Sequence, residues 1–260
     1  MDDLERARLA FATQVVSGID ASDRLRAAFA AVSRETFAGP PPWSIFSGSG
    51  YEVRGSSDAR LLYQDVLIAL APDRRINNGQ PSLHAACLAA VDPQPGESVL
   101  HVGAGTGYYT AILAELVGPS GRVIAHEIEG DLAAMAGAAL GAWPQVRLLA
   151  RSGTEGPFDP ADVVYVSAGV THPVAGWLDC LNIGGRLICP MTSADLGGAM
   201  LLVTRRSASM FAARFLMRVG FIPCTGARSD GESQALSRAF AQRDMHAVRS
   251  LQRATAPDES

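Results

Sequence analysis

The spacing of apolar residues divides the chain into a helical beginning and a longer stretch of alternating strands and helices. From residue 2 to residue 38 apolar side chains recur at helical spacing, which predicts helices. The run DASD, residues 20–23, offers an N-cap for the second of them. The segment GPPPWSIFSGSG then breaks the pattern because proline has no amide donor, so residues 39–60 are predicted to be a covering loop.

The next stretch is less regular. LLYQDVLIAL, residues 61–70, is apolar throughout and is compatible with a strand or a helix. APDRRINNGQPS is predicted to be a second loop. SLHAACLAAV is predicted to be a helix that begins at Ser82 as its N-cap.

From residue 98 onward short apolar strands alternate with helices. The predicted strands are SVLHVGAG, GRVIAHEI, QVRLLA, ADVVYVSA, GGRLICPM and AMLLVTRR. A helix over Tyr108–Val117 follows the first strand, and an alanine-rich helix after Asp131 follows the second. This alternation predicts an α/β fold with a doubly wound, mostly parallel sheet and helices on both faces, preceded by the N-terminal helical segment. The apolar character of the strands agrees with burial on both faces.

Three regions are therefore expected. Residues 1–60 hold the N-terminal helices and the covering loop, residues 61–224 the α/β core, and residues 225–260 a helical tail with a frayed end. A chain of 260 residues with 48% hydrophobic residues is long enough to bury one substantial core.

Composition excludes several classes of function. The net charge of −4 and the absence of a basic run give no reason to expect nucleic acid as a partner. No stretch approaches the roughly 18 apolar residues that a membrane helix needs, and the acidic start MDDLERARLAFATQ is unlike a secretory signal. Four cysteines stand far apart without a CxxC pair, which favours reduced thiols and a cytoplasmic location.

The turn after the first strand of the core carries the strongest chemical signal. It contains Gly103, Gly105 and Gly107, and glycine there allows a sharp turn and the close approach of a ligand. A dinucleotide fingerprint would place its third glycine at position 108, where this chain has Tyr108. The G-x-G-x-G pattern suits an uncharged or zwitterionic nucleoside, and it disfavours a nicotinamide-dependent oxidoreductase.

The second strand of the core ends in an acid. Glu127 stands 20 positions after Gly107 (127 minus 107). In a doubly wound sheet that position lies at the carboxyl end of the neighbouring strand, in the ligand crevice. Its carboxylate is predicted to accept hydrogen bonds from ribose hydroxyls; the alternative is an exposed acid at a strand end.

Over residues 25–224 the chain resembles the protein-L-isoaspartate O-methyltransferase family of class I S-adenosylmethionine-dependent methyltransferases, which have a Rossmann-like fold. The segments that carry the resemblance are RLRAAFAAVSRETF, YQD, NNGQPSLHA, VLHVGAGTGYYTAILAELVGPSGRV and HPVAGWLDCLNIGGRLICPM. The resemblance implies a divergent methyltransferase that uses S-adenosyl-L-methionine, releases S-adenosyl-L-homocysteine and methylates a carboxylate of a peptide, a protein or a small molecule. A monomer or a weak homodimer is expected.

The resemblance also implies site residues. Those implied for the cofactor are His101, Gly103, Ala104, Gly105, Thr106, Gly107, Tyr108, Glu127, Ile128, Ser152 and Gly153. Those implied for catalysis are Gln80 and Ser82, and no residue is implied for a metal. Transfer from a sulfonium to an ionised carboxylate needs positioning and desolvation but no general base, so a catalytic triad is not required.

The chain departs from the family at three positions. His101 stands where the family has an acid near the methionine amino group, and Ser152 stands in place of the acid near the adenine. Gly79 replaces a serine that lies at the methyl acceptor in the family, so isoaspartyl repair is predicted to be weak or absent. The two missing acids also leave open a cofactor-binding scaffold without turnover.

Several residues allow two interpretations. If the imidazole of His101 contacts the cofactor, affinity should fall as the pH drops through about 6.5; otherwise His101 is a buried strand residue. Ser82 is equally compatible with a helix cap alone, and His84 with a helix-surface residue. The pair His84 and Cys87 is too small for a metal site. Trp43 is predicted to anchor the loop on the core rather than to line a pocket.

Overall fold

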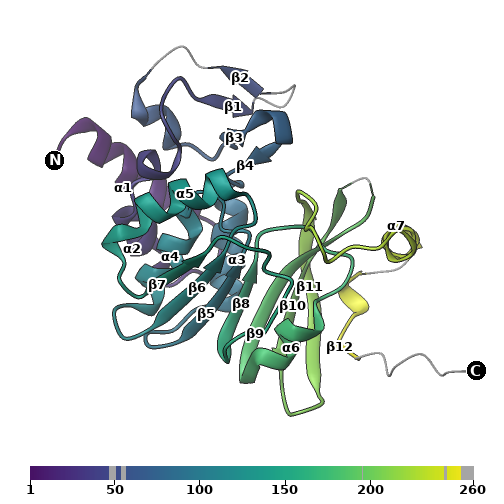
Figure 1. The fold of residues 1–260 in the computed structure, drawn as a ribbon. Helices are drawn as coiled ribbons and strands as arrows, with labels where there is room; N and C mark the ends of the chain where they lie inside the picture. The colour runs from purple at the N-terminus through teal and green to yellow at the C-terminus, as the bar shows by residue number, and fades with distance from the viewer. Residues whose placement is uncertain (47–50, 54–56, 195, 243–244, 253–260) are drawn as a thin grey trace, which may run out of the picture. The chain divides into compact units, whose positions relative to one another are not determined.

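The chain forms two compact units, Met1–Gly153 and Thr154–Ser260 (Figure 1). The computed structural model of the protein describes residues 1–46, 51–53, 57–194, 196–242 and 245–252. Residues 253–260, where fraying is predicted, lie outside the described residues, as do residues 47–50 and 54–56 of the predicted loop.

The first unit contains the predicted N-terminal helices and three strands of the core. Its elements are α1 (Asp3–Val15), α2 (Asp23–Ala31), η1 (Arg34–Phe37), β1 (Ser44–Phe46), β2 (Tyr51–Val53), η2 (Ala59–Leu62), β3 (Ala69–Ala71), η3 (Pro72–Arg74), β4 (Ile76–Asn77), α3 (Pro81–Val91), β5 (Ser98–Val102), α4 (Tyr108–Val117), β6 (Arg122–His126), α5 (Gly130–Ala139), η4 (Leu140–Ala142) and β7 (Val146–Leu149). The predicted N-cap of α2 is confirmed, because the side chain of Ser22 accepts a hydrogen bond from the amide of Leu25.

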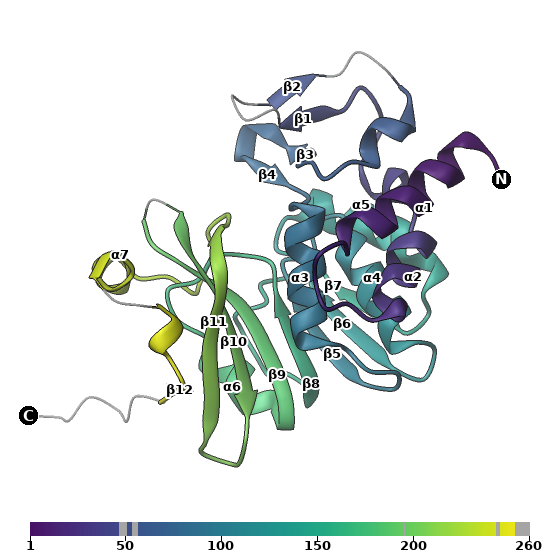
Figure 2. The same ribbon diagram turned by 180° about the vertical axis from the view of Figure 1, so that it is seen from behind.

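Strands β5, β6 and β7 pair in parallel, with His101 opposite Ala125 and Ala125 opposite Leu148. Figure 2 shows α1, α2, α3 and α4 in front of these strands. The helix predicted over Tyr108–Val117 is α4 and has those limits. It begins at Gly107 as its N-cap, and all of its residues except Glu115 are buried.

A buried arginine joins the N-terminal helices to the segment after η2. The guanidinium of Arg34 donates hydrogen bonds to the carbonyl oxygens of Leu62, Gln64 and Val66, and its side chain is 1% exposed. It lies 5.3 Å from the centre of the Phe11 ring, a distance typical of a cation–π contact. Three main-chain acceptors therefore hold the charge and fix the course of residues 62–66.

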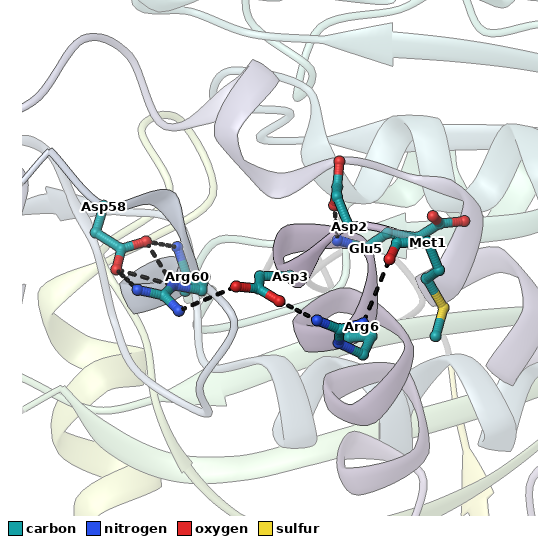
Figure 3. A network of polar contacts seen from close by, with 7 residues as sticks. All are labelled: Met1, Asp2, Asp3, Glu5, Arg6, Asp58 and Arg60. Carbon is teal, nitrogen blue, oxygen red and sulfur yellow. Dashed lines mark hydrogen bonds and ion pairs between the residues drawn. The ribbon is translucent and has the colours of Figure 1, made fainter.

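A second link, between α1 and η2, lies at the surface (Figure 3). The guanidinium of Arg60 forms an ion pair with Asp58 at 2.6 Å and reaches Asp3 of α1 at 4.0 Å, and Asp3 also contacts Arg6. These side chains are exposed, so the pairs contribute little to stability compared with the buried contacts of Arg34.

The loop predicted over residues 39–60 is only partly irregular. Strands β1 and β2 pair in antiparallel fashion within it, with Ile45 opposite Glu52, so the prediction is wrong for these short strands. Trp43 is confirmed as an anchor: it packs against Leu62 and Ile68 and is 6% exposed. The burial of its ring explains how a proline-rich segment holds a defined course.

The helix α3 begins earlier than predicted. Its N-cap is Gln80, and Pro81 occupies the first helical position, where a missing amide costs nothing. Ser82 is therefore inside the first turn, and the prediction that it caps the helix is wrong.

The second unit has a sheet with a parallel and an antiparallel part. Its elements are β8 (Ala161–Val166), α6 (Ala175–Cys180), β9 (Leu181–Thr192), β10 (Gly197–Arg205), β11 (Phe211–Gly220), α7 (Asp230–Gln242), η5 (Met245–Ala247) and β12 (Ser250–Leu251). Strands β8 and β9 are parallel, but β10, β11 and β12 each pair in antiparallel fashion with the preceding strand. The strand AMLLVTRR is thus antiparallel, and β11 is an addition that the apolar pattern does not predict.

The described residues contain neither a candidate membrane span nor a candidate metal cluster. No helix in this part of the chain is both long and apolar enough to cross a membrane. No group of three or more His, Cys, Asp or Glu side chains in the same residues is arranged to hold a metal ion. The four cysteines are free thiols, and burial raises the pKa of Cys87 to about 12.

Candidate functional site

The glycine turn lies at the carboxyl ends of β5 and β6. The amides of Gly103 and Ala104 both donate to the carbonyl oxygen of His126, at 2.9 and 3.0 Å. Gly107 closes the turn with φ +98°, and a Cβ at this position would come within 3.0 Å of the Leu140 side chain. The turn therefore requires glycine at Gly107, both for its backbone conformation and for space. It leaves the first amides of α4 without intrahelical partners.

Glu127 lies directly against this turn. One carboxylate oxygen accepts a hydrogen bond from the amide of Gly105 at 2.6 Å, and the other accepts one from the amide of Glu129 at 2.9 Å. The residue is 5% exposed, and burial raises the pKa of its carboxyl group although the two amides oppose that shift. The structure thus brings together the glycine turn and the acid that stands 20 positions further along the chain.

The turn after β7 completes the same edge of the sheet. The Nδ1–H of His126 donates to the carbonyl oxygen of Ser152 at 3.2 Å. A Cβ on Gly153 would come within 2.7 Å of Val102 and 3.1 Å of His126, so a larger residue would push this turn away from the strand ends. Ile128, next to Glu127, leaves 48% of its side chain exposed and offers an apolar surface at this edge.

Two residues of the glycine turn direct their side chains elsewhere. The hydroxyl of Thr106 donates to the carbonyl oxygen of Phe37 at 2.5 Å. The ring of Tyr108 packs against Phe29 and Phe37, and burial raises the pKa of its hydroxyl. The backbone of these residues lies in the turn, while their side chains attach it to the N-terminal segment.

His101 is a buried residue of β5. Its Nδ1 shares a hydrogen bond with the hydroxyl of Thr110 on α4 at 2.9 Å, and the side chain is 1% exposed. Burial, with a smaller contribution from the neighbouring His126, lowers the pKa of this imidazole to about 3. The ring is therefore neutral at physiological pH, and the structure favours the interpretation of His101 as a buried strand residue.

A separate polar cluster holds the start of α3. Asp65 accepts hydrogen bonds from the amide of Ser82 at 2.7 Å, from its hydroxyl at 2.6 Å and from the side-chain amide of Gln80 at 2.9 Å. Gln80 and Ser82 are thus brought together, but by a carboxylate of a preceding segment. The importance of Asp65 is not predicted by its position, although the YQD motif contains it.

His84 is buried under Gly79 and is not a surface residue of the helix. Its ring stacks on Tyr109 with 3.7 Å between the ring centres and 12° between the planes, and 3% of the residue is exposed. Gly79 has φ +73°, and its carbonyl oxygen accepts a hydrogen bond from the Tyr109 hydroxyl at 3.3 Å. Burial lowers the pKa of His84 to about 3, with smaller contributions from His101 and Arg34.

Comparisons with known proteins agree on one family. Residues 10–229 match the family model described as protein-L-isoaspartate(D-aspartate) O-methyltransferase. The chain is 32% identical over 231 residues to a protein-L-isoaspartate O-methyltransferase of Aeropyrum pernix, which covers 86% of this chain and 82% of that protein. It is 34% identical over 170 residues to protein-L-isoaspartate O-methyltransferase 1 of Rhodopseudomonas palustris, which covers 64% and 67% of the two chains.

Solved structures show the same fold. One protein-L-isoaspartate O-methyltransferase superposes with a TM-score of 0.70 at 23% identity and covers 93% of this chain and 71% of that one. A Plasmodium falciparum protein assigned to the same family, solved in complex with S-adenosyl-L-homocysteine, superposes with a TM-score of 0.66 at 16% identity and covers 86% and 99%. The predicted α/β fold of the Rossmann-like class is confirmed by these likenesses.

Proposed function

Because the chain belongs to the protein-L-isoaspartate(D-aspartate) O-methyltransferase family, we propose that it methylates a carboxylate of a peptide or protein at the edge of the sheet formed by β5, β6 and β7. The enzyme is a methyltransferase that depends on S-adenosylmethionine. The observation that carries the proposed site is the contact of Glu127 with the glycine turn at 2.6 Å.

Each residue of this edge would contact a different part of the cofactor. The carboxylate of Glu127 is a charged acceptor in a fixed position, where it would accept hydrogen bonds from the ribose hydroxyls. Ile128 would lie against the adenine ring, and Ser152 and Gly153 would contact its edge. The backbone from Gly103 to Gly107 would enclose the methionine part, because no side chain fills the turn at its glycines.

For this reaction the protein mainly has to position the two reactants and exclude water from them. When bound, S-adenosylmethionine would supply an activated methyl group: a carboxylate oxygen would bond to the methyl carbon as the carbon–sulfur bond breaks, and the electron pair of that bond would remain on sulfur. No proton moves, since a carboxylate is ionised at neutral pH. The protein must therefore align the acceptor with the sulfonium, and alignment of this kind is worth several kcal/mol.

The segment Gly79–Ser82 would border the acceptor. Asp65 fixes the side chains of Gln80 and Ser82, and Gly79 contributes only its backbone. An acceptor is therefore offered no side-chain hydrogen bond at position 79. We expect weak or absent methylation of isoaspartyl peptides, which is measured as methyl incorporation into an isoaspartyl peptide and its aspartyl twin. Robust turnover that is selective for the isoaspartyl peptide would contradict this expectation.

Calorimetry on Glu127 variants tests the cofactor site. Glu127→Gln should weaken the binding of S-adenosyl-L-homocysteine by about 10- to 150-fold, the effect of losing hydrogen bonds to a charged group. Glu129→Gln is the matched control, because the side chain of Glu129 pairs with Arg74 at the surface. Thermal unfolding of both variants shows whether the fold is retained.

The same measurements separate the alternatives. An unchanged dissociation constant in Glu127→Gln removes Glu127 from the site. Binding of NAD in place of S-adenosyl-L-homocysteine would support an oxidoreductase. Tight binding of S-adenosyl-L-homocysteine without methyl incorporation into any protein carboxylate would support a scaffold without turnover.

A further inference from the structure

A short hairpin of the first unit lies against the glycine turn. It consists of β3 and β4, which pair in antiparallel fashion with Ala69 opposite Asn77, and η3 forms its tip. The side chain of Leu70 in β3 lies next to Gly105, because a Cβ on that glycine would come within 3.5 Å of Leu70 Cδ1. The hairpin thus borders the same residue whose amide donates to Glu127.

The tip of this hairpin is tied to the start of α5 by Arg74. Its guanidinium donates to both carboxylate oxygens of Asp131, with Nη1 3.0 Å from Oδ1, and it also donates to the carboxylate of Glu129. The hydrogen bonds between Arg74 and Asp131 raise the pKa of the guanidinium and lower that of the carboxyl group. Figure 1 shows the hairpin beside α5, so the ion pairs close a gap of more than 50 residues in the sequence.

Glu129 links this contact to the acid of the proposed cofactor site. Its side chain pairs with Arg74, while its amide donates to Glu127 at 2.9 Å. At the other end of the hairpin, β4 leads within two residues into Gly79, where the segment proposed to border the acceptor begins. The position of the hairpin therefore affects both the acceptor segment and the surroundings of the Glu127 carboxylate.

We infer that this hairpin closes the proposed cofactor site and that the ion pairs of Arg74 with Glu129 and Asp131, the latch, set how often it opens. The inference rests on the proposed cofactor site at Glu127. Opening must precede both the entry of the cofactor and the release of its product. The latch therefore changes the rates of association and dissociation together, and it leaves the dissociation constant, the quantity compared in Glu129→Gln, nearly unchanged. Arg74 is a positioning residue, since it acts through the hairpin.

The exposure of the latch makes it sensitive to salt. The side chains of Arg74, Glu129 and Asp131 are 35%, 34% and 60% exposed. Added salt screens ion pairs between such groups, whereas it does not weaken the apolar contact of Leu70. The hairpin should therefore open more often as the ionic strength rises, provided that residue 74 carries a positive charge.

Hydrogen exchange of the full chain without any ligand measures the opening. Deuterium uptake in the peptide that contains residues 68–79, followed by mass spectrometry, should be about 2- to 30-fold faster in Arg74→Gln, the factor that corresponds to two exposed ion pairs. Arg74→Lys keeps the charge and should stay close to the unmodified protein. Arg60→Gln is the matched control, because Arg60 pairs with Asp58 and Asp3 at the surface near α1. It should leave the uptake of the hairpin unchanged.

Stopped-flow mixing with S-adenosyl-L-homocysteine, followed by tryptophan fluorescence, measures the exchange of the ligand. In Arg74→Gln the rate constants of association and dissociation should both rise by a similar factor, and the dissociation constant should change by less than about twofold. Raising sodium chloride from about 50 mM to about 500 mM should increase both rate constants in the unmodified protein and in Arg74→Lys, but not in Arg74→Gln.

The inference is overturned if the uptake of the hairpin is the same in Arg74→Gln as in the unmodified protein, or if Arg60→Gln increases it equally. It is also overturned if the hairpin of Arg74→Gln opens faster while the ligand keeps its rate constants, or if salt accelerates the exchange in this variant as in the unmodified protein. If S-adenosyl-L-homocysteine does not bind the unmodified protein at all, the proposed function fails instead, and hydrogen exchange still decides whether Arg74 holds the hairpin.

Discussion

Replacing Gly79 by serine introduces the residue type that the resemblance to the family implies for this position, yet we expect the change to destabilise the protein. Gly79 has φ +73°, and a residue with a Cβ pays about 1–2 kcal/mol in this left-handed conformation. The new Cβ would also lie 2.3 Å from Nε2 and 2.8 Å from Cδ2 of His84. Something must move, because Cβ atoms do not approach other atoms so closely.

The imidazole of His84 has little room to give way. It is buried and stacked on Tyr109 at 3.7 Å, so a shift of the ring would disturb a packed neighbour. Overpacking of this kind costs about 1–3 kcal/mol. With the backbone contribution, the free energy of unfolding should fall by about 2–5 kcal/mol, which lowers Tm by at least about 4 °C in a chain of this size.

Two further variants separate the causes. Gly18→Ser is the matched control, because Gly18 has φ +79° and no atom lies within 4 Å of its hypothetical Cβ. It should lose only the backbone contribution of about 1–2 kcal/mol. In a His84→Ala background, Gly79→Ser should also lose only this amount, so a double-mutant cycle should give a coupling of about 1–3 kcal/mol.

Urea unfolding of the four variants, followed by circular dichroism, measures these differences. Methylation of an isoaspartyl peptide is measured on the same samples. The reasoning is refuted if Gly79→Ser costs no more than Gly18→Ser whatever residue stands at position 84. It is equally refuted if Gly79→Ser keeps its stability and gains isoaspartyl activity by itself, since the segment would then accept a side chain freely.

Three other predictions concern polar groups of the first unit. Unfolded histidines bind protons near pH 6.5, but His84 and His101 stay neutral in the folded protein until about pH 3. Urea unfolding should therefore show the free energy of unfolding falling as the pH drops from 6.5 toward 3, by up to about 1.4 kcal/mol per pH unit for each histidine. A flat profile would contradict the burial of these two side chains. For the same reason His101 should give S-adenosyl-L-homocysteine no loss of affinity between pH 8 and 5.5, which calorimetry in the unmodified protein and in His101→Gln can check. Asp65→Ala removes the acceptor of the Ser82 amide and should cost about 2 kcal/mol in urea unfolding, whereas a loss below a few tenths would mean that another group caps α3.

The sequence alone determines the elements whose pattern is local. The limits of α4 follow from the glycine turn before it and from the continuous run of buried residues within it, so they are predicted to the residue. The place of Glu127 is also predictable, because parallel strands joined by a helix end at the same edge and the spacing brings the acid there. A resemblance that spans many segments strengthens both predictions.

The sequence does not decide how distant segments meet. The position of His84 on a helix gives no sign that its ring lies under Gly79, since that contact depends on how α3 packs against α4. Asp65 precedes Ser82 by 17 residues, and it lies at the start of α3 within a segment whose carbonyl oxygens on either side, those of Gln64 and Val66, are held by Arg34. Strand β10 is apolar whichever way it runs, so its antiparallel pairing is decided by the short turn that follows β9.

The protonation state of His101 shows most clearly the difference between what the sequence determines and what the tertiary structure decides. Its place in a strand, two residues before the first glycine, is visible in the sequence, and so is the loss of the acid. Whether the imidazole is charged depends on how far water is excluded from it and on the hydroxyl of Thr110, nine residues away on α4. Burial is a property of the assembled fold, because water is excluded by neighbours from several elements at once, and the tertiary structure therefore decides that this histidine is neutral.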